Sequence, residues 1–227
     1  MKAMILAAGL GTRLRPLTDD RPKALVEVAG HTMLEIILRR LQAFGICDVI
    51  INTHHFAGMV LQYLKTNADF GMNIEVSREE FLLDTGGGLK KAGWFFSGEE
   101  PFILHNVDVI SSIDLRRMVQ FHAENEALAT LAVQDRKTSR PLSFDEHLQL
   151  CGRGPGLAFC GIHVISPRLL TMLTEEGVFS IITSYLRLAA RGEKILAFRA
   201  DEYDWRDMGR PENVIQAAKE SLIREEE

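Results

Sequence analysis

The chain has 227 residues, of which 46% are apolar and 25% charged, the composition of an ordinary soluble globular protein. Its formal net charge of −5 comes without a basic patch, which argues against nucleic acid as a partner. The apolar run at residues 3–8 lacks a cleavable signal pattern and is far too short to span a bilayer, which argues against a membrane location.

Short apolar runs alternate with helical patterns along the chain. The runs predict strands at Ala3–Leu6, Val49–Asn52, Ile74–Val76, Phe102–Leu104, Leu128–Val133, Leu157–Ile165 and Ile195–Phe198. Apolar spacing predicts helices at Met33–Phe44, Ala57–Leu64, Asp114–Ala123, Ile181–Ala190 and from Pro211 onward. The proline- and glycine-rich residues 141–156 are expected to form a loop, and residues 225–227 are expected to fray.

The helix at Met33–Phe44 has the clearest boundaries. Thr32 and Glu35 form a capping box at its start, and Gly45 supplies a C-terminal stop. Strand–helix–strand alternation predicts an α/β fold, in which a doubly wound, mostly parallel (mixed) sheet is flanked by helices. In such sheets, ligands bind beyond the carboxyl ends of the strands.

The cysteines and the chain length bear on compartment and domain number. Cys47, Cys151 and Cys160 are odd in number and lack metal-ligand spacing, so we expect buried thiols in a reducing compartment, the cytoplasm. The chain is long enough to bury one good core and contains no linker, repeat or low-complexity tract. Residues 1–227 are therefore expected to form a single domain.

A loop with two glycines follows the first predicted strand, carries Arg13 and leads to Lys23. Gly9 and Gly11 allow a phosphate to approach the backbone, and consecutive amides in such a turn bind anions. The dinucleotide fingerprint does not fit, because Leu14 stands at its third glycine, and no Gly-Lys-Ser/Thr follows as in a P-loop. A tight turn with solvated cations is the alternative, but the pattern favours phosphate binding.

This stretch resembles the signature of the nucleotide-sugar pyrophosphorylases (sugar-1-phosphate nucleotidyltransferases), roughly L-A-A-G-x-G-T-R-L-x-P-L-T and then P-K. The matching residues are Leu6, Ala7, Ala8, Gly9, Gly11, Thr12, Arg13, Leu14, Pro16, Leu17, Thr18, Pro22 and Lys23. The resemblance implies a Rossmann-like nucleotidyltransferase fold in which the nucleotide is bound by Leu6, Ala7, Ala8, Gly9, Gly11 and Thr12. It also implies that Arg13 stabilises the departing pyrophosphate and that Lys23 contacts phosphate in the active site.

Asn106-Val107-Asp108 follows the predicted strand Phe102–Leu104. A carboxylate at such a strand end could hold Mg²⁺ together with substrate phosphates, or it could cap the next helix. In the resembling family this strand often ends in N-G-D, and its Asp binds the metal. The resemblance therefore implies that Asp108 is a metal ligand and that Asn106 contacts the nucleotide. Val107 stands where relatives have glycine, so its side chain either crowds the nucleotide or is accommodated by a shift of the chain. The second outcome is favoured, because the surrounding catalytic positions are otherwise retained.

Two later stretches also resemble the family. Trp205-Arg206-Asp207-Met208-Gly209 is similar to its W-x-D-x-G element, which implies that Asp207 is the second Mg²⁺ ligand. Without the other motifs, Asp207 would be read as a surface turn residue. Phe159-Cys160-Gly161-Ile162 is similar to an aromatic-x-G-I stretch whose glycine lies near the sugar. Gly161 is therefore a sugar-binding candidate, or else a strand glycine under a neighbouring side chain.

Three glycines in Asp84-Thr85-Gly86-Gly87-Gly88 would be costly in a plain helix. They indicate either a backbone that a flat ligand approaches closely or a glycine-rich helix start. The stretch resembles the E-T-G-G-G segment that lies beside the base in muramic-acid and hexose-phosphate uridylyltransferases. This resemblance implies that Thr85 and Gly86 contact the nucleotide, mainly through backbone groups.

The resemblance covers nearly the whole chain and implies an Mg²⁺-dependent transferase of nucleotide-sugar biosynthesis. Such an enzyme transfers a nucleoside monophosphate from a nucleoside triphosphate, with UTP favoured, to a sugar 1-phosphate and releases pyrophosphate. The sugar phosphate is itself the nucleophile, so positioning and charge stabilisation suffice. Two alternatives stay open: a weak or inactive regulatory relative that binds a nucleotide or sugar phosphate, and a nucleotidyltransferase that acts on a non-sugar phosphate such as phosphocholine. A monomer or small homo-oligomer is expected.

Overall fold

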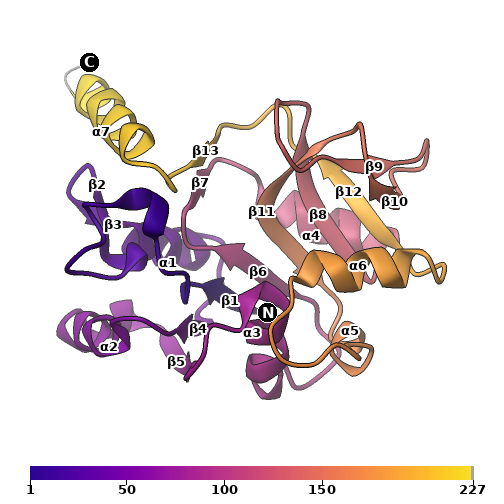
Figure 1. Ribbon diagram of the computed structural model, residues 1–227, viewed down its shortest axis with the longest axis horizontal. Helices are drawn as coiled ribbons and strands as arrows, with labels where there is room; N and C mark the ends of the chain where they lie inside the picture. Colours follow the sequence, from indigo (N-terminus) through magenta and orange to yellow (C-terminus); the bar gives the residue numbers. More distant parts are fainter. Residues whose placement is uncertain (226–227) are drawn as a thin grey trace.

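The computed structural model describes residues 1–225 and centres on a large β-sheet (Figure 1). The sheet has seven strands in the order β12-β8-β11-β6-β1-β4-β5. They are β1 (Lys2–Leu6), β4 (Asp48–Thr53), β5 (Asn73–Arg78), β6 (Phe102–Asn106), β8 (Ala129–Gln134), β11 (Ala158–Ile165) and β12 (Ile195–Arg199). Neighbours run parallel except at β11, which is antiparallel to β6 and β8. The predicted mostly parallel, mixed sheet is confirmed, and every predicted strand belongs to it.

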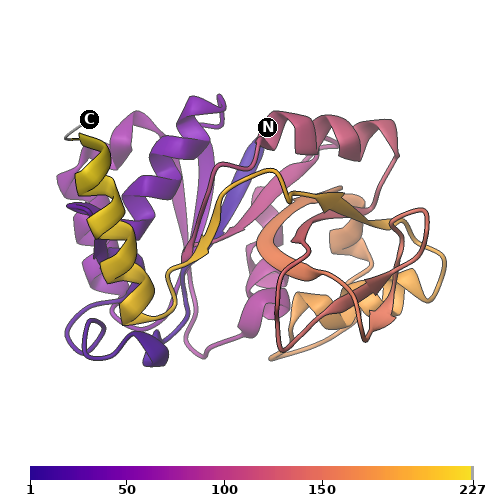
Figure 2. The same ribbon diagram turned by 90° about the horizontal axis from the view of Figure 1, so that it is seen from above.

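Helices cover both faces of the sheet, as Figure 2 shows from above. They are α1 (Met33–Ala43), α2 (Ala57–Thr66), α3 (Asp84–Ala92), α4 (Leu115–Glu124), α5 (Arg168–Thr171), α6 (Ile181–Ala189) and α7 (Pro211–Glu225). Short 3-10 turns form η1 (Thr12–Leu14), η2 (Lys23–Leu25), η3 (Ala68–Gly71) and η4 (Gly93–Phe95). The predicted helices are present, whereas α5 was not predicted and α3 was anticipated only as the alternative of a glycine-rich helix start. Within residues 1–225, no helix is long and apolar enough to cross a membrane.

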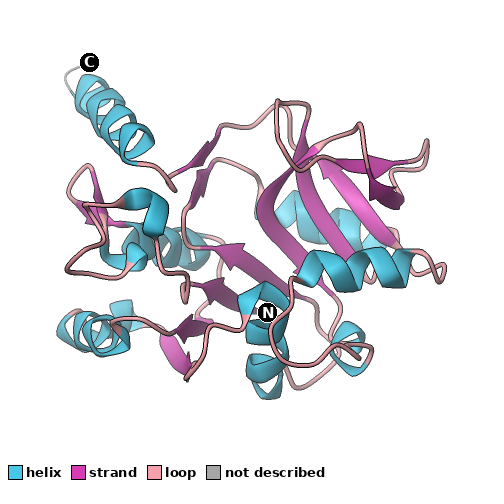
Figure 3. Cartoon of the chain, in the orientation of Figure 1, coloured by secondary structure: helices cyan, strands magenta, loops and turns pink. Residues whose placement is uncertain are grey.

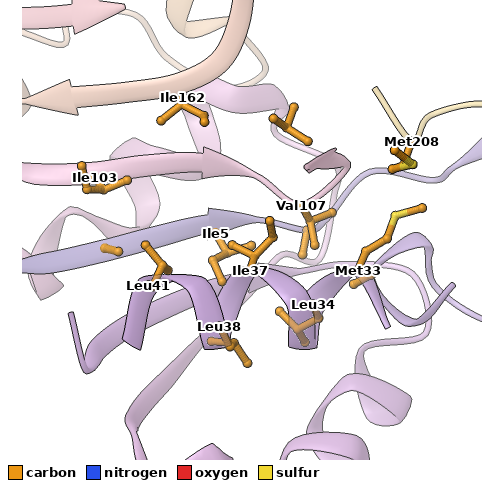
Figure 4. Packing of buried hydrophobic residues seen from close by; sticks show 14 of the residues in the cluster. Ile5, Met33, Leu34, Ile37, Leu38, Leu41, Ile103, Val107, Ile162 and Met208 are labelled. Carbon is orange, nitrogen blue, oxygen red and sulfur yellow. The ribbon is translucent and has the colours of Figure 1, made fainter. Parts of the chain in front are cut away.

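Strand β1 is apolar on both of its faces because both faces of the sheet are covered. Ala3 and Ile5 pack in the cluster formed with α1 (Figure 4), whereas Met4 packs in the cluster formed with α3 and α6. All three side chains are fully buried. A strand buried on both faces reads as a continuous apolar run, which is why the sequence predicts it well.

Helix α1 begins and ends where its sequence signals stand. Thr32 Oγ1 accepts the backbone N–H of Glu35 at 3.1 Å, which is the first half of the predicted capping box. The carboxylate of Glu35 instead binds Arg39 and Tyr63. Gly45 has a φ of +79°, and its N–H donates to Gln42 O at 2.8 Å, as expected for a C-terminal stop.

The prediction of a loop at residues 141–156 is wrong. This stretch contains β9 (Leu142–Phe144) and β10 (Leu150–Arg153), which form an antiparallel hairpin (Figure 3). Strands this short carry too little alternation to stand out among glycines and prolines. Two further ribbons pair β2 (Glu27–Val28) with β3 (His31–Thr32) and β7 (Val109–Ser111) with β13 (Trp205–Asp207).

The expectation of three buried cysteines is also wrong in part. Cys160 is buried, and burial raises the pKa of its thiol to about 11. Cys47 and Cys151 are exposed, the latter because it alternates with buried Leu150 along β10.

The C-terminal residues 225–227 were expected to fray. Of these, residues 226–227 lie outside the described part of the chain.

Candidate active site

The carboxyl ends of three neighbouring strands meet at one edge of the sheet. Leu6, the last residue of β1, pairs in register with Asn52 of β4 and Asn106 of β6. A cavity of about 380 Å³, here called the first cavity, opens beside these residues and is also lined by Ala8 and Gly9. The loops that follow the parallel strands therefore converge on one cavity, as the doubly wound topology predicts.

The glycine loop after β1 is fixed at both ends. Ala7 N–H donates to Asn52 Oδ1 at 2.7 Å, and Thr18 Oγ1 donates to Gly11 O at 2.9 Å. Gly11 has a φ of +64°, and a Cβ there would lie 2.9 Å from Thr18 Cγ2, so a larger residue would be strained. Gly9 faces open space, since a Cβ there would meet nothing within 4 Å. A phosphate can therefore approach the backbone at Gly9.

Lys23 and Asp108 form an ion pair, and each side chain is only 13% exposed. Lys23 begins η2, whereas Asp108 follows β6 by two residues. Both side chains also line the first cavity. The pair therefore presents an ammonium group and a carboxylate to the space beside Gly9.

Strand β13 brings Asp207 next to Asp108. Asp207 pairs with Val109 of β7, and Met208 N–H donates to Asp108 O at 2.7 Å. Arg13 Nη1 lies 3.9 Å from Asp207 Oδ2. Two predicted metal ligands and two predicted cations, which come from distant parts of the sequence, therefore gather at one place.

The donor set at Asp108 and Asp207 fits a magnesium ion. Among the side chains that the structure describes, those of residues 1–220, no group of three or more His, Cys, Asp or Glu could enclose a metal. Mg²⁺ does not need such a cage, because it is usually held by one or two carboxylates, substrate phosphates and water. The two carboxylates lie beside cations that can meet those phosphates.

A second cavity of about 320 Å³ lies on the other side of Asn106 and is lined by Arg13, Asp207 and Gly161. Gly161 has a φ of +76°, and a Cβ there would lie 2.8 Å from Asn106 Nδ2. Glycine is therefore required here by both the backbone and the neighbouring amide. Gly161, the predicted sugar-binding residue, therefore lines a cavity. It also lies under the side chain of Asn106, as the alternative interpretation expected.

The start of α3 borders the first cavity through Thr85, whose Oγ1 also accepts the N–H of Ile181 at 3.0 Å. Gly86 donates its N–H to Phe179 O at 2.9 Å, and a Cβ there would strike the Phe179 ring. The stretch is thus a glycine-rich helix start, and Gly86 is explained by contact with the protein's own chain. A nucleotide contact at Gly86 stays a prediction.

Of the two expectations for Val107, crowding of the nucleotide is the one that the structure contradicts. Its side chain is 2% exposed and belongs to the apolar core. It points toward α1, near Ile37 and Leu34 (Figure 4). Because Asn106 and Asp108 face the cavities, the residue between them turns to the opposite side. The valine therefore fills core space and leaves the site open.

The sequence analysis missed a buried carboxylate behind the glycine loop. Glu79, 2% exposed, accepts Asn52 Nδ2 at 2.7 Å on one oxygen and Leu83 N–H at 2.9 Å on the other. Asn52 in turn holds Ala7. A Cβ on Gly88 would lie 2.7 Å from Glu79 Oε1, so this glycine makes room for the carboxylate. Only the position of Asn52 at a strand end hinted at this network.

His105, one residue before Asn106, is not equipped to transfer protons at the site. It is fully buried, and burial, aided by the Arg40 charge, lowers its pKa to about 4. Its Nδ1 lies 2.8 Å from Asn106 O. His105 is therefore neutral near pH 7 and serves as a packed core residue.

The remaining predicted residues differ in their surroundings. Ala7 is buried and donates its N–H to Asn52, whereas Thr12 is exposed at the start of η1.

The second cavity is also lined by Arg140 and Arg153, which the sequence analysis did not single out. Arg153 lies in the stretch that was expected to be a loop and Arg140 directly precedes it, so no regular pattern drew attention to them.

Comparison with known proteins shows which family and which relatives the chain resembles. A family model described as nucleotidyl transferase matches residues 2–144. An N-acetylmuramate alpha-1-phosphate uridylyltransferase of Caulobacter vibrioides is 33% identical over 95% of this chain and 94% of its own length. A UTP–glucose-1-phosphate uridylyltransferase of Synechocystis is 26% identical over 99% of this chain, which spans 64% of that relative. The crystal structure of HddC from Yersinia pseudotuberculosis with GMP-PN has a TM-score of 0.82 at 21% identity, covering 96% of this chain and 98% of the other.

Proposed function

The chain belongs to the nucleotidyl transferase family of enzymes, and we propose that it transfers a uridylyl group from UTP to a sugar 1-phosphate and releases pyrophosphate. The observation that carries the proposal is the meeting of two cavities at Asn106 and Asp108. The first cavity, beside the glycine loop, suits the nucleotide. The second, beside Gly161, suits the sugar. The reacting phosphates then lie between them.

The chain's own residues supply binding and charge at this junction. Gly9 offers open backbone for the triphosphate, and Lys23 offers a compact charge. Arg13 is positioned to stabilise negative charge on the leaving pyrophosphate. A phosphate oxygen of the sugar attacks the α-phosphorus in line, so the bond to pyrophosphate breaks as the new P–O bond forms. No side-chain nucleophile is needed, because positioning does the main part.

Asp108 and Asp207 would hold Mg²⁺ in this proposal. The metal would supply neutralisation of phosphate charge, the general role of such ions in phosphoryl transfer. Lys23 pairs with Asp108 in the structure, so its ammonium group lies beside the carboxylate that would hold the metal, where it would also meet substrate phosphate. In this proposal, Asp108 and Asp207 serve as metal ligands during the reaction, in addition to pairing with Lys23 and Arg13.

Support for UTP comes from the relatives. The names of both uridylyltransferases described above indicate transfer of a uridylyl group. One of the two relatives matches this chain over nearly its whole length. The first cavity can hold a base between the glycine loop and Thr85, above the polar floor of Asn52 and Glu79. The alternative of an inactive regulatory relative was based on the valine at position 107. The side chain of Val107 is buried in the core and does not enter the cavity, so this reason for the alternative is removed.

The test is a matrix of the common nucleoside triphosphates against sugar 1-phosphates, including those of N-acetylmuramate and glucose, read by pyrophosphate release. We expect turnover with UTP to exceed that with other bases. An Asp207→Asn variant run in parallel separates site-dependent turnover from a contaminant. Absence of pyrophosphate release with every pair would contradict the proposal, and release with another base would correct the assignment of UTP.

A further inference from the structure

Two arginines at the sugar side of the site have no acidic partner among the side chains that the structure describes. Arg140 and Arg153 line the second cavity and also an adjoining third cavity of about 410 Å³. Among residues 1–220, whose side chains the structure describes, neither guanidinium group has an ion pair or a side-chain hydrogen bond. Arg13 and Lys23, by contrast, each face a carboxylate. The site therefore contains one engaged pair of cations and one unengaged pair.

The main chain around the unengaged pair is well anchored. Arg153 is opposite Leu142 in the β9–β10 ladder, and Arg140 precedes Leu142 by two residues, so both lie at the open end of the hairpin. Leu142 and Leu157 exchange two backbone hydrogen bonds of 2.9 Å at this end. The ladder anchors the backbone at Arg153, and both arginine side chains are exposed at the cavities, so their guanidinium groups are accessible to an anion.

The third cavity is positive in character. Besides the two arginines, it is lined by Ser180–Ile182, the N-terminal end of α6, which adds the partial positive charge of the helix dipole. The lining also includes one carboxylate, Asp84, and its Oδ1 already accepts Thr85 N–H at 2.6 Å. An anion in this cavity would therefore meet two full positive charges and a helix N-terminus.

We propose that the sugar substrate carries a second anionic group on its ring, and that Arg140 and Arg153 bind it. This inference rests on the proposed function. The 1-phosphate must lie beside Lys23 and Asp108 to reach the α-phosphorus, so it cannot also occupy the third cavity. The ring then extends past Gly161 toward the arginines. Guanidinium groups bind carboxylates and phosphates in two-point fashion, which selects an acidic sugar over a neutral one.

The test compares two matched pairs of sugar 1-phosphates with the intact protein. N-acetylglucosamine 1-phosphate is compared with its 3-O-lactyl ether, N-acetylmuramate 1-phosphate, which adds a carboxylate. Glucose 1-phosphate is compared with glucose 1,6-bisphosphate, which adds a phosphate. We expect kcat/KM to rise by about 10- to 100-fold with the added anion in one pair, the range of one charge-assisted hydrogen bond. The pair that responds identifies the group.

Variants then connect this preference to the arginines. Arg140→Gln and Arg153→Gln remove the charge but keep a polar side chain, and each is expected to lower the acidic-to-neutral ratio of kcat/KM by about 10-fold. Lysine at either position should restore part of the ratio. Arg191→Gln, at an exposed arginine outside the cavities, is the matched control and should keep the ratio of the unchanged protein.

Three outcomes would overturn the inference. The first is an equal kcat/KM for both members of each pair. The second is an equal loss with acidic and neutral sugars in the arginine variants, because the arginines would then bind the common 1-phosphate. If no pair is turned over at all, the proposed function fails, and calorimetric binding of the same sugar phosphates replaces the rates. Equal affinity for acidic and neutral sugars would then be the third overturning outcome, and tighter binding of the acidic sugar that depends on Arg140 and Arg153 would support the inference.

Discussion

Arg13 and Asp207 face each other across the candidate site, with Nη1 of the arginine 3.9 Å from Oδ2 of the aspartate. The two side chains are 59% and 33% exposed, so their attraction is weak. A Cβ on Gly209 would lie 2.8 Å from Arg13 Nη2, so the glycine leaves the guanidinium room beside the strand end. Arg13 can therefore leave Asp207 for a stronger anion such as a phosphate.

The first prediction concerns this arginine. Arg13→Ala should lower kcat by roughly 100-fold or more, because loss of a charged donor at the reacting group costs about 3 kcal/mol. Steady-state pyrophosphate release measures the effect, and circular dichroism checks the fold. Arg15→Ala is the matched control, since Arg15 is exposed in the same segment and pairs with Asp19. Near-normal turnover of the Arg13 variant would remove this residue from the mechanism.

The second prediction concerns the carboxylates. Activity should vanish with a chelator and return with Mg²⁺, and Asp108→Asn and Asp207→Asn should each raise the Mg²⁺ concentration needed for half-maximal rate. Titration of the rate with Mg²⁺ measures this. Asp204→Asn is the control, because Asp204 is an exposed aspartate just before β13. Ordinary metal dependence in both site variants would mean that the ligands lie elsewhere.

The third prediction concerns Val107. Val107→Gly should leave activity unimproved and lower the free energy of unfolding by about 2–4 kcal/mol, because it removes a buried side chain and adds unfolded-state entropy. Urea unfolding measures the loss, and Val107→Ala should show an intermediate one. A large gain in kcat in the glycine variant would instead indicate that the valine restrains the site.

The case of Val107 shows what the sequence could and could not predict. Strands of the central sheet, such as β1, are apolar throughout, so composition alone locates them. The alternation of Asn106, Val107 and Asp108 between cavity and core depends on the register of β6, which a motif match does not contain. A family comparison at one position is therefore a poor guide to side-chain direction.

The placement of residues at the cavities was predictable where they follow strands or match long motifs, as for Arg13 and Lys23. It was not predictable where a partner is distant and ordinary in type. Glu79 is one glutamate among many in the sequence, and its burial beneath Gly88 arises only from packing. Likewise, Arg140 and Arg153 become neighbours only through a hairpin whose strands are too short to recognise.

The fourth prediction concerns Glu79. Glu79→Gln places an amide donor against the donors of Asn52 or Leu83, so one buried hydrogen bond is lost, at a cost of about 1–3 kcal/mol in stability. Because Asn52 holds Ala7, the KM for the nucleoside triphosphate should rise more than kcat falls. Glu80→Gln, at the exposed neighbouring residue, is the control. An unchanged KM would show that the glycine loop does not depend on this network.

The fifth prediction concerns the pH dependence of stability. Burial lowers the pKa of His105 and His122 to about 4 and that of His163 to about 3, so the folded protein keeps all three neutral. In the unfolded chain they take up protons below about pH 6.5. The unfolded state thus binds more protons, and the free energy of unfolding must fall as the pH drops from about 6.5 toward 4, whereas these groups have no effect above that window.

The contribution of His122 to this dependence can be measured separately from the candidate site. Its ring nitrogens lie 2.9 Å from Thr130 Oγ1 and Ser166 Oγ, and neither of these residues lines the site cavities. Urea unfolding of His122→Gln at several pH values should give a lower stability at pH 7 but a smaller decrease between pH 6.5 and 5, because one proton fewer is taken up on unfolding. His147→Gln, at an exposed histidine, should leave the slope unchanged. An equal slope in the His122 variant would mean that this ring is already protonated in the folded protein.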